Sequence, residues 1–263
     1  MAGPRRIGKS VAIIDAIANI CAAGTVDLRQ IIHVPCDGME VRDLRRTLTI
    51  GRAMTGVDDR EKARPRIWFF DEISSIRGWS AALKQARDQT EFGGDTIVAT
   101  GSRWASDEDV LGNLVAGRTG SAAGHRIRQL LPMTFREFAA AAKIDLSSIE
   151  TAHPADLQNP KTKTELAELT FFVDEFDLAW QQYLTAGGFP RAVSEHLHDG
   201  AVSNAYVRDL VAWLRADVGP DTETDSVELL LNGISTRMTS PINVQRATED
   251  LNYSGRPVFE RRI

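Results

Sequence analysis

Hydrophobic residues in residues 1–143 follow two alternating spacings. Ile13, Ile17 and Ile20 recur every three or four residues, which predicts an amphipathic helix over residues 10–23. Short apolar runs between helical stretches instead predict buried strands. These runs lie at residues 31–36, 67–72, 95–102 and 127–131. Because strands alternate with helices, we predict an α/β fold with a parallel sheet and flanking helices.

The alternation of strands and helices then stops, and a mainly helical C-terminal region is predicted to follow. Pro154 and Pro160 among mixed polar residues indicate a linker over residues 144–165. Apolar residues keep helical spacing over residues 166–225. Residues 226–263 carry short helical segments that predict a partial helix-turn-helix or winged-helix element. A helical hairpin packed on its own domain is the alternative interpretation.

A phosphate-binding loop is predicted near the N-terminus, where the sequence matches G-x-x-x-x-G-K-[ST] in full. Its members are Gly3, Pro4, Arg5, Arg6, Ile7, Gly8, Lys9 and Ser10. In such a loop the backbone N–H groups point at a triphosphate, and glycines at both ends permit the close approach. Lys9 would reach the β- and γ-phosphates, and the Ser10 hydroxyl would bind Mg²⁺. The alternative is a chance glycine-rich turn.

A pair of carboxylates, Asp71 and Glu72, forms the second signal, at the end of the apolar run 67–70. A buried parallel strand delivers such residues to the carboxyl edge of the sheet, where ligands bind in open α/β folds. We expect Asp71 to hold Mg²⁺ and Glu72 to polarise the attacking water. Taken alone, the pair also fits the start of a helix. Its combination with the phosphate-binding loop favours the catalytic interpretation.

Polar residues and arginines follow in the next part of the chain. Thr100 and Ser102 lie where a γ-phosphate sensor is expected in this architecture, and a plain turn at the strand end is the alternative. Arg118 and Arg126 could each stabilise transition-state charge, in the same chain or from a neighbouring subunit. An ordinary solvated arginine fits each of these two positions equally well.

The composition describes a chain that can bury a sizeable core. Of 263 residues, 43% are hydrophobic and 25% are charged. The net charge of −5 argues against a protein coated with positive charge for nucleic acid, although a local basic face is compatible with it. Cys21 and Cys36 have neither metal-binding nor disulfide spacing. The sequence shows neither an apolar run of membrane-spanning length nor a secretory signal, so we predict a cytoplasmic protein without a membrane partner.

One element expected from the loop is missing from the sequence pattern. A phosphate-binding loop normally follows a buried strand, and only Met1 and Ala2 precede Gly3. We therefore expect the sheet to lack its first strand and the chain to be truncated at its start. The C-terminal element also breaks off before its third helix or a wing is complete, which predicts truncation at that end too.

Together these motifs resemble those of a group of prokaryotic AAA-type P-loop ATPases. The resemblance rests on residues 3–10, on Phe70-Asp71-Glu72-Ile73 with Trp79 and Leu83-Lys84, on Thr100-Gly101-Ser102, and on residues 131–138 and 183–190. Members of this group carry a C-terminal domain of unknown function that often includes a winged-helix element. The resemblance therefore implies an ATPase core over residues 1–143, followed by a helical domain.

The resemblance also implies roles for individual residues. Those that match the family's motifs toward ATP and Mg²⁺ are Lys9, Ser10, Asp71, Glu72 and Ser102, with Arg118 as a candidate arginine finger. The function we predict is Mg²⁺-dependent ATP binding and hydrolysis coupled to a conformational output. The alternatives are a nucleotide-gated interaction or DNA-binding module with little turnover, and a non-functional fragment. A DNA or protein partner at the C-terminal region and assembly into an oligomer are both compatible with the sequence.

Overall fold

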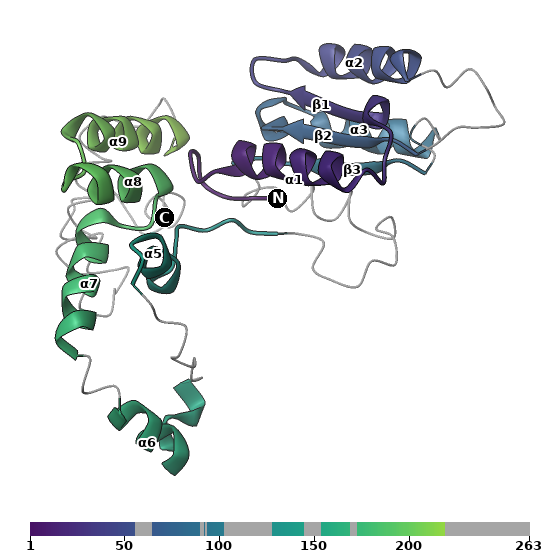
Figure 1. Ribbon diagram of the computed structural model, residues 1–263. Coiled ribbons are helices and arrows are strands. Elements are labelled where there is room, and N and C mark those ends of the chain that lie inside the picture. The colour runs from purple at the N-terminus through teal and green to yellow at the C-terminus, as the bar shows by residue number, and fades with distance from the viewer. Residues whose placement is uncertain are drawn as a thin grey trace, which may run out of the picture. The chain divides into compact units, whose positions relative to one another are not determined.

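The computed structural model describes residues 1–55, 65–89, 92, 94–102, 128–144, 154–168 and 173–218 (Figure 1). By its internal contacts the chain divides into two compact units, Met1–Ser194 and Glu195–Ile263. The first unit contains a β-sheet with its flanking helices and several helices that follow it in the sequence.

A three-stranded parallel sheet is the framework of the first unit, in agreement with the prediction from the apolar runs. Its strands are β1 (Ile31–Pro35), β2 (Ile67–Asp71) and β3 (Thr96–Ala99), in the order β1-β2-β3. The register pairs Val34 with Phe70 and Phe70 with Ala99, so the carboxyl ends of the strands lie at one edge. Among the described strands β1 lies at the side of the sheet, which suits Pro35 because proline has no N–H to donate.

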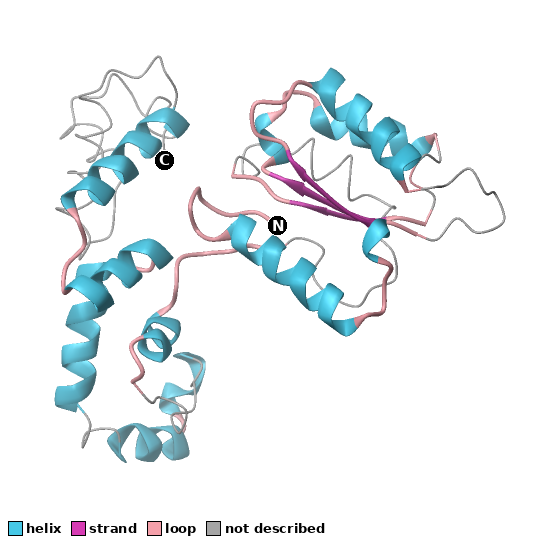
Figure 2. Ribbon diagram, turned by 45° about the horizontal axis from the view of Figure 1, so that its top comes forward, coloured by secondary structure: helices cyan, strands magenta, loops and turns pink. Residues whose placement is uncertain are grey.

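Helices cover both faces of this sheet (Figure 2). They are α1 (Lys9–Ala23), α2 (Val41–Met54) and α3 (Trp79–Asp88). The helices α2 and α3 pack over the face that holds Trp68 and Phe70, whose stacked rings are 5.7 Å apart between centroids. The helix α1 covers the opposite face, where Phe69 is buried. Because alternate residues of a strand point to opposite faces, the continuous apolar run 67–70 contributes to the packing on both sides.

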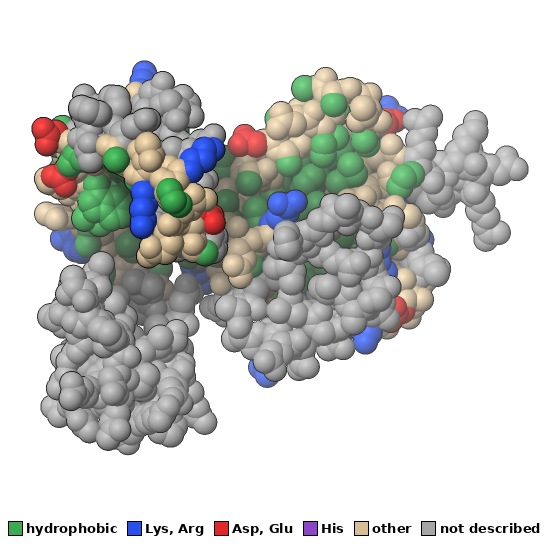
Figure 3. Space-filling model, turned by 90° about the horizontal axis from the view of Figure 1, so that it is seen from below, with side chains coloured by type: hydrophobic (Ala, Val, Ile, Leu, Met, Phe, Trp, Pro, Cys, Tyr) green, Lys and Arg blue, Asp and Glu red, His purple; other side chains and the backbone are tan. Residues whose placement is uncertain are grey.

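The helix α1 has the predicted amphipathic stripe, and it also carries apolar residues on its outer side. Ile13 is buried and Ile17 is partly buried, in agreement with the prediction. Val11 and Ile14 are 59% and 57% exposed. In the view from below, hydrophobic side chains gather on the part of the molecule that holds the sheet and α1 (Figure 3).

A buried ion pair joins the amino ends of β2 and β3. Asp95 accepts hydrogen bonds from the Arg66 backbone N–H at 2.9 Å, the Arg66 Nε at 2.8 Å and the Trp68 Nε1 at 2.8 Å. The side chains of Arg66 and Asp95 are only 6% and 3% exposed. Arg66 Nη1 also donates to Thr55 Oγ1, at the end of α2, at 3.4 Å. The network therefore connects two strands and a helix at the edge opposite to the carboxyl ends.

The residues that precede the phosphate-binding loop lie between the end of β3 and a segment far along the chain. Ala2 forms parallel β-bridges with Gly101 and with Gln129. Backbone hydrogen bonds of 2.8 and 2.7 Å join Ala2 to the residues on either side of Gln129. In its described part, the strand predicted over residues 127–131 is therefore a single β-bridge, because it pairs with only one residue, Ala2.

The described chain beyond this bridge is helical, as predicted. Its helices are α5 (Phe135–Ala141), α6 (Pro160–Glu168), α7 (Val173–Ala186), α8 (Pro190–Asp199) and α9 (Asn204–Val218), with a 3₁₀ turn η4 (Pro154–Gln158) before α6. A capping box begins α5: the Thr134 hydroxyl accepts the Glu137 N–H, and the Glu137 carboxylate accepts the Thr134 N–H. Phe135 of α5 packs on Trp180 of α7 with ring centroids 5.2 Å apart.

A short segment, residues 128–133, connects the sheet to these helices, and we call it the strap. Ala2 is bonded to its first part, as described above. At its other end the Met133 N–H donates to the Gly188 carbonyl at 2.7 Å, and the Met133 carbonyl accepts the Tyr183 hydroxyl at 2.7 Å. Glycine is required at position 188, because a Cβ there would lie 2.5 Å from the Met133 carbonyl oxygen. The strap is therefore hydrogen-bonded at both ends.

Parts of the predicted domain organisation fall outside the described residues. The linker predicted over residues 144–165 contains η4 and the first residues of α6 in its described part. The element predicted over residues 226–263 lies outside, so the division into four parts stays a prediction. Of the helices in the described part of the chain, none is long and apolar enough to cross a membrane.

Candidate functional site

The predicted phosphate-binding loop leads directly into the N-terminus of α1. Gly8 precedes the helix with a φ of 102°, which favours glycine, and Arg6 also has a positive φ of 59°. Within the described chain, this helix end has no side-chain cap and no acidic residue in its first turn. Its N–H groups and the positive end of the helix dipole are therefore suited to an anion.

Gly3 begins this loop, and the structure gives it a role beside the one expected from the motif. A Cβ at this position would lie 2.3 Å from the Leu130 carbonyl oxygen of the strap. The sequence motif explains this glycine by the approach of a phosphate. The structure adds a second reason, which is the close packing of the loop against the strap.

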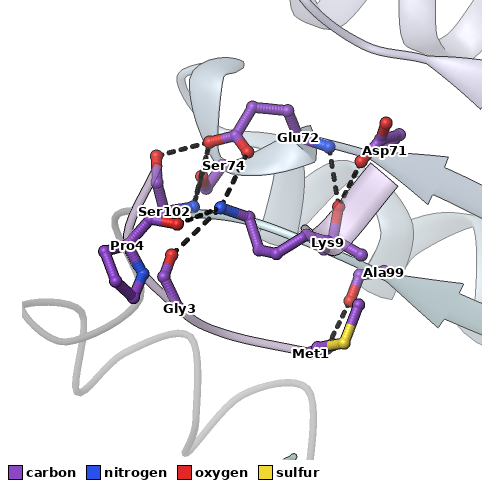
Figure 4. Close-up of polar contacts among 10 residues, drawn as sticks. Met1, Gly3, Pro4, Lys9, Asp71, Glu72, Ser74, Ala99 and Ser102 are labelled. Atoms are coloured by element: carbon purple, nitrogen blue, oxygen red, sulfur yellow. Dashed lines mark hydrogen bonds and ion pairs between the residues drawn. The ribbon is translucent and has the colours of Figure 1, made fainter. Parts of the chain in front are cut away.

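Lys9 is the first residue of α1, and its ammonium group lies in the centre of the site (Figure 4). The side chain is only 5% exposed. Its Nζ donates to the carbonyls of Gly3 at 3.0 Å and Pro4 at 2.8 Å, and it lies 3.5 Å from Glu72 Oε2. A buried charge needs such partners, because leaving an ammonium group unpaired in the interior is costly.

Asp71 ends β2 at the carboxyl edge of the sheet, as predicted. Its Oδ1 accepts a hydrogen bond of 2.6 Å from the hydroxyl of Thr100, which follows β3. Thr100 is fully buried, and its hydroxyl oxygen also accepts the Glu72 N–H at 2.9 Å. Of the two candidate sensors, Thr100 therefore has its hydroxyl engaged with the two carboxylate residues.

Glu72 follows β2 and contacts both the phosphate-binding loop, through Lys9, and the residues after β3, through Ser102. Its Oε1 accepts hydrogen bonds from the Ser102 N–H at 2.9 Å and from the Ser102 hydroxyl. Ser74 Oγ lies 3.5 Å from the same oxygen and accepts the Ser102 N–H at 3.1 Å. The other oxygen of Glu72 faces Lys9 (Figure 4). Two other predicted site residues, Lys9 and Ser102, thus both contact Glu72.

The remaining predicted site residues differ in their surroundings. Ser10 is the second residue of α1 and its side chain is exposed, whereas the Ile7 side chain is buried at 3% exposure. Pro4 and Arg6 are exposed, and Arg5 is partly buried. Arg118 lies outside the described residues, as does Arg126.

A buried cysteine, Cys36, lies next to the carboxyl edge of the sheet. Cys36 follows β1, and its N–H donates to the Asp71 carbonyl at 2.8 Å. Burial and, to a smaller extent, the negative charge of Asp71 together raise the pKa of the Cys36 thiol to about 12. The thiol is therefore neutral at physiological pH, which makes it a packing residue of the core and not a nucleophile.

The donor set at this edge fits a nucleotide with Mg²⁺. Phosphate binding needs N–H donors and a cation, which the start of α1 and Lys9 provide. Mg²⁺ takes oxygen ligands, commonly one or two from the protein and the rest from phosphates and water. Ser10 and Asp71 are oxygen ligands of this kind. In the described part of the chain, no group of three His, Cys, Asp or Glu residues could hold a metal ion. Phosphate and water oxygens would therefore have to complete the ligands of Mg²⁺ here.

Comparison with known proteins agrees with this geometry. A family model described as an AAA domain matches residues 1–139, which is more than half of the chain. The matched region contains the phosphate-binding loop, the sheet and both carboxylates. A search of curated proteins finds no match to the chain.

Proposed function

Because the chain belongs to the AAA domain family of P-loop ATPases, we propose that it binds ATP together with Mg²⁺ and hydrolyses the terminal phosphoanhydride bond. The observation that supports hydrolysis is the position of the Glu72 carboxylate. One of its oxygens lies 3.5 Å from the Lys9 Nζ, and the other accepts hydrogen bonds from Ser102. A base, a cation suited to phosphate and a hydroxyl donor are therefore side by side.

Each residue has one task in this proposal. The N–H groups at the start of α1 and the Lys9 ammonium bind the β- and γ-phosphates. Ser10 and Asp71 hold Mg²⁺, which neutralises charge on the phosphate oxygens when it is bound. Glu72 accepts the proton of the attacking water, and Ser102 donates a hydrogen bond to the γ-phosphate.

The contact between Lys9 and Glu72 has to change during this reaction. An ammonium group paired with a carboxylate has less charge to offer a phosphate. When Lys9 binds phosphate instead, Glu72 Oε2 becomes available to a water molecule. The Ser102 hydroxyl then turns from Oε1 to the γ-phosphate, while Oε1 keeps the hydrogen bond from the Ser102 N–H. Nucleotide binding would then itself prepare the base. Arg118, from this chain or a neighbouring subunit, is our candidate for stabilising charge in the transition state.

A second candidate function is a nucleotide-gated interaction module with little turnover. In this case a DNA or protein partner binds the C-terminal region. We propose that the partner binds a winged-helix element over residues 226–263. The observation that favours it is that both oxygens of Glu72 have partners, in Lys9 and in Ser102 with Ser74. A carboxylate held in this way is a slow base. Both candidates share a conformational output.

Binding and turnover assays separate the two candidates. We would measure equilibrium binding of a fluorescent ATP analogue and steady-state phosphate release, each with and without Mg²⁺ and double-stranded DNA. Lys9→Ala should abolish detectable binding, because the charge-assisted contact to phosphate is lost. Lys163→Ala, an exposed lysine on α6, is the matched control and should bind like the wild-type chain.

Each outcome of these assays supports or excludes a particular candidate function. Binding with phosphate release supports the ATPase. Binding without phosphate release, with or without DNA, supports the nucleotide-gated module. Unchanged affinity after Lys9→Ala would remove the basis of both.

A further inference from the structure

Thr100 is a buried polar residue that contacts both carboxylate residues of the site. It follows β3 and has 0% of its surface exposed. Its hydroxyl donates to Asp71 Oδ1 at 2.6 Å and accepts the Glu72 N–H at 2.9 Å. One side chain just after β3 is therefore bonded to two consecutive residues at the end of β2. Figure 4 shows Asp71 and Glu72 at this position.

The backbone of Thr100 is fixed on the same segment. Its N–H donates to the Phe70 carbonyl at 2.9 Å, and its carbonyl accepts the Ile73 N–H at 2.9 Å. Backbone and hydroxyl together thus bind four successive residues, from Phe70 to Ile73. Because these bonds leave the side chain little rotational freedom, the hydroxyl is a fixed point of reference for both carboxylates.

The bond to Asp71 determines how its carboxylate is turned. A donor at 2.6 Å on Oδ1 fixes the rotation of the carboxylate plane, and with it the direction of the second oxygen. A metal-binding carboxylate is commonly oriented by a hydrogen bond of this kind from a neighbouring residue. If Asp71 holds Mg²⁺, Thr100 sets the direction from which it does so.

The bond to the Glu72 N–H acts on the backbone. Glu72 has a φ of 54°, in the left-handed region that glutamate rarely adopts. This turn sends its side chain toward Lys9 and Ser102. A conformation of this kind persists only when surrounding contacts hold it, and the Thr100 hydroxyl is one such contact.

We propose that Thr100 is a positioning residue of the nucleotide site, which orients Asp71 for Mg²⁺ and holds the backbone turn that places Glu72. This inference rests on the proposed function. It differs from the sensor role suggested by the position of Thr100 in the sequence, because the hydroxyl acts through the two carboxylate residues and not on the phosphate.

The test compares Thr100→Val with Thr100→Ser. Valine keeps the shape and removes the hydroxyl, whereas serine keeps the hydroxyl. Thr49→Val on α2 is the matched control, because that hydroxyl is exposed and donates to the Arg45 carbonyl of its own helix at 3.2 Å. Amide hydrogen exchange without nucleotide is the first measurement. We expect the Glu72 N–H to exchange at least 10-fold faster in Thr100→Val, and at the wild-type rate in the other two variants.

Mg²⁺ dependence is the second measurement. The Mg²⁺ concentration for half-maximal nucleotide binding should rise about 10-fold in Thr100→Val, a typical effect of losing a residue that orients a metal ligand. Binding in EDTA should not change, because the phosphate contacts of the loop remain. The turnover number should fall with little change in KM, and Thr100→Ser should restore both properties.

The outcomes distinguish this inference from the proposed function. If the wild-type chain binds nucleotide but Thr100→Val has wild-type Mg²⁺ dependence and Glu72 exchange, Thr100 is not a positioning residue and the proposed function stands. Thr100 is likewise not a positioning residue if Thr100→Ser fails to restore the wild-type Mg²⁺ dependence and Glu72 exchange. A wild-type chain that binds no nucleotide overturns the proposed function, and the role of Thr100 with it.

Discussion

At the scale of single residues, Glu72 has the contacts that define the site. The positive φ of this residue turns the chain away from the direction of β2. Its carboxylate is thereby placed between Lys9 on the phosphate-binding loop and Ser102 after β3. A residue in an uncommon backbone conformation at the point where three segments meet is consistent with a catalytic task.

Replacing Glu72 by glutamine should separate binding from chemistry. Glutamine keeps the shape and can still accept the Ser102 N–H, but it cannot take a proton from water. We expect phosphate release to fall by about 10²-fold or more while ATP binding persists. Asp15→Asn, an exposed acidic residue of α1, is a suitable control and should behave like the wild-type chain. Turnover at the wild-type rate would show that another group activates the water.

The two cysteines should react very differently with alkylating reagents. Cys21 is exposed and Cys36 is buried. Burial raises the pKa of Cys36 from 9.0 to about 12. At pH 8 its thiolate fraction is therefore about 10³-fold lower than that of a thiol with the ordinary pKa. Iodoacetamide at pH 8 should therefore label one thiol rapidly, and the second only after unfolding in urea. As the pH rises toward the pKa of Cys36, its thiolate fraction and its labelling rate should increase.

Mass mapping of the labelled peptides provides the check. Cys21→Ser should remove the rapid phase and leave the slow one. Rapid labelling of Cys36 in the folded chain would contradict its burial beside Asp71.

The sequence predicts the principal site residues but not their supports. Lys9, Asp71 and Glu72 follow from motifs in which each letter has a chemical reason at fixed spacing. Ser74 carries no such signal, and the position of Thr100 predicts a sensor and not a support of the two carboxylates. Their contacts depend on the register of β2 with β3 and on the turn at Glu72, and neither is visible in a linear pattern.

At the scale of elements, apolar runs located the strands well and their ends less well. The run predicted over 67–72 ends as a strand at Asp71, because Glu72 leaves the extended conformation. The run over 95–102 forms a strand only over Thr96–Ala99. At its start the Asp95 side chain binds the neighbouring strand, and hydrophobicity alone does not indicate such side-chain contacts.

The buried pair of Arg66 and Asp95 should be important for stability. Asp95→Asn removes the negative charge, leaves the Arg66 guanidinium without a counterion in the interior, and points an NH₂ group at other donors. Breaking one partner of a buried pair costs about 3–5 kcal/mol. We expect a loss of that size in the free energy of unfolding, measured in urea.

The control for this prediction is again Asp15→Asn, at an exposed position where the change should be within about 0.5 kcal/mol. A loss below about 1 kcal/mol in Asp95→Asn would mean that water or a rearranged side chain replaces the carboxylate.

At the scale of the whole molecule, the strap is the feature that the sequence pattern does not predict. It joins Ala2 and Gly3 at the start of the chain to Gly188, between α7 and α8. The contacts with Ala2 connect residues more than a hundred positions apart, and the contact of Met133 with Gly188 spans 55 positions, so no local pattern indicates them. The parallel sheet and the helical C-terminal region, in contrast, followed directly from the change in hydrophobic spacing.

Gly188→Ala should destabilise the first unit. The added Cβ would lie 2.5 Å from the Met133 carbonyl oxygen and 2.9 Å from the Met133 nitrogen. Because both are backbone atoms, the overlap cannot be relieved by a side-chain rotation, and we expect a loss of about 1–3 kcal/mol in the free energy of unfolding. Gly94→Ala, where the nearest atom would be 3.9 Å away, is the matched control. Equal melting of the two variants would contradict the close contact.

The length of the strap has a mechanical consequence. Its anchors at Leu130 and Met133 are three residues apart, and Pro132 between them restricts the backbone. Three residues span at most about 10–11 Å when fully extended, so the strap has little slack. A displacement of the phosphate-binding loop relative to the end of α7 by more than a few ångströms would have to break the bonds at one anchor. The strap thus limits how far the phosphate-binding loop can move from the end of α7 while both sets of hydrogen bonds remain intact.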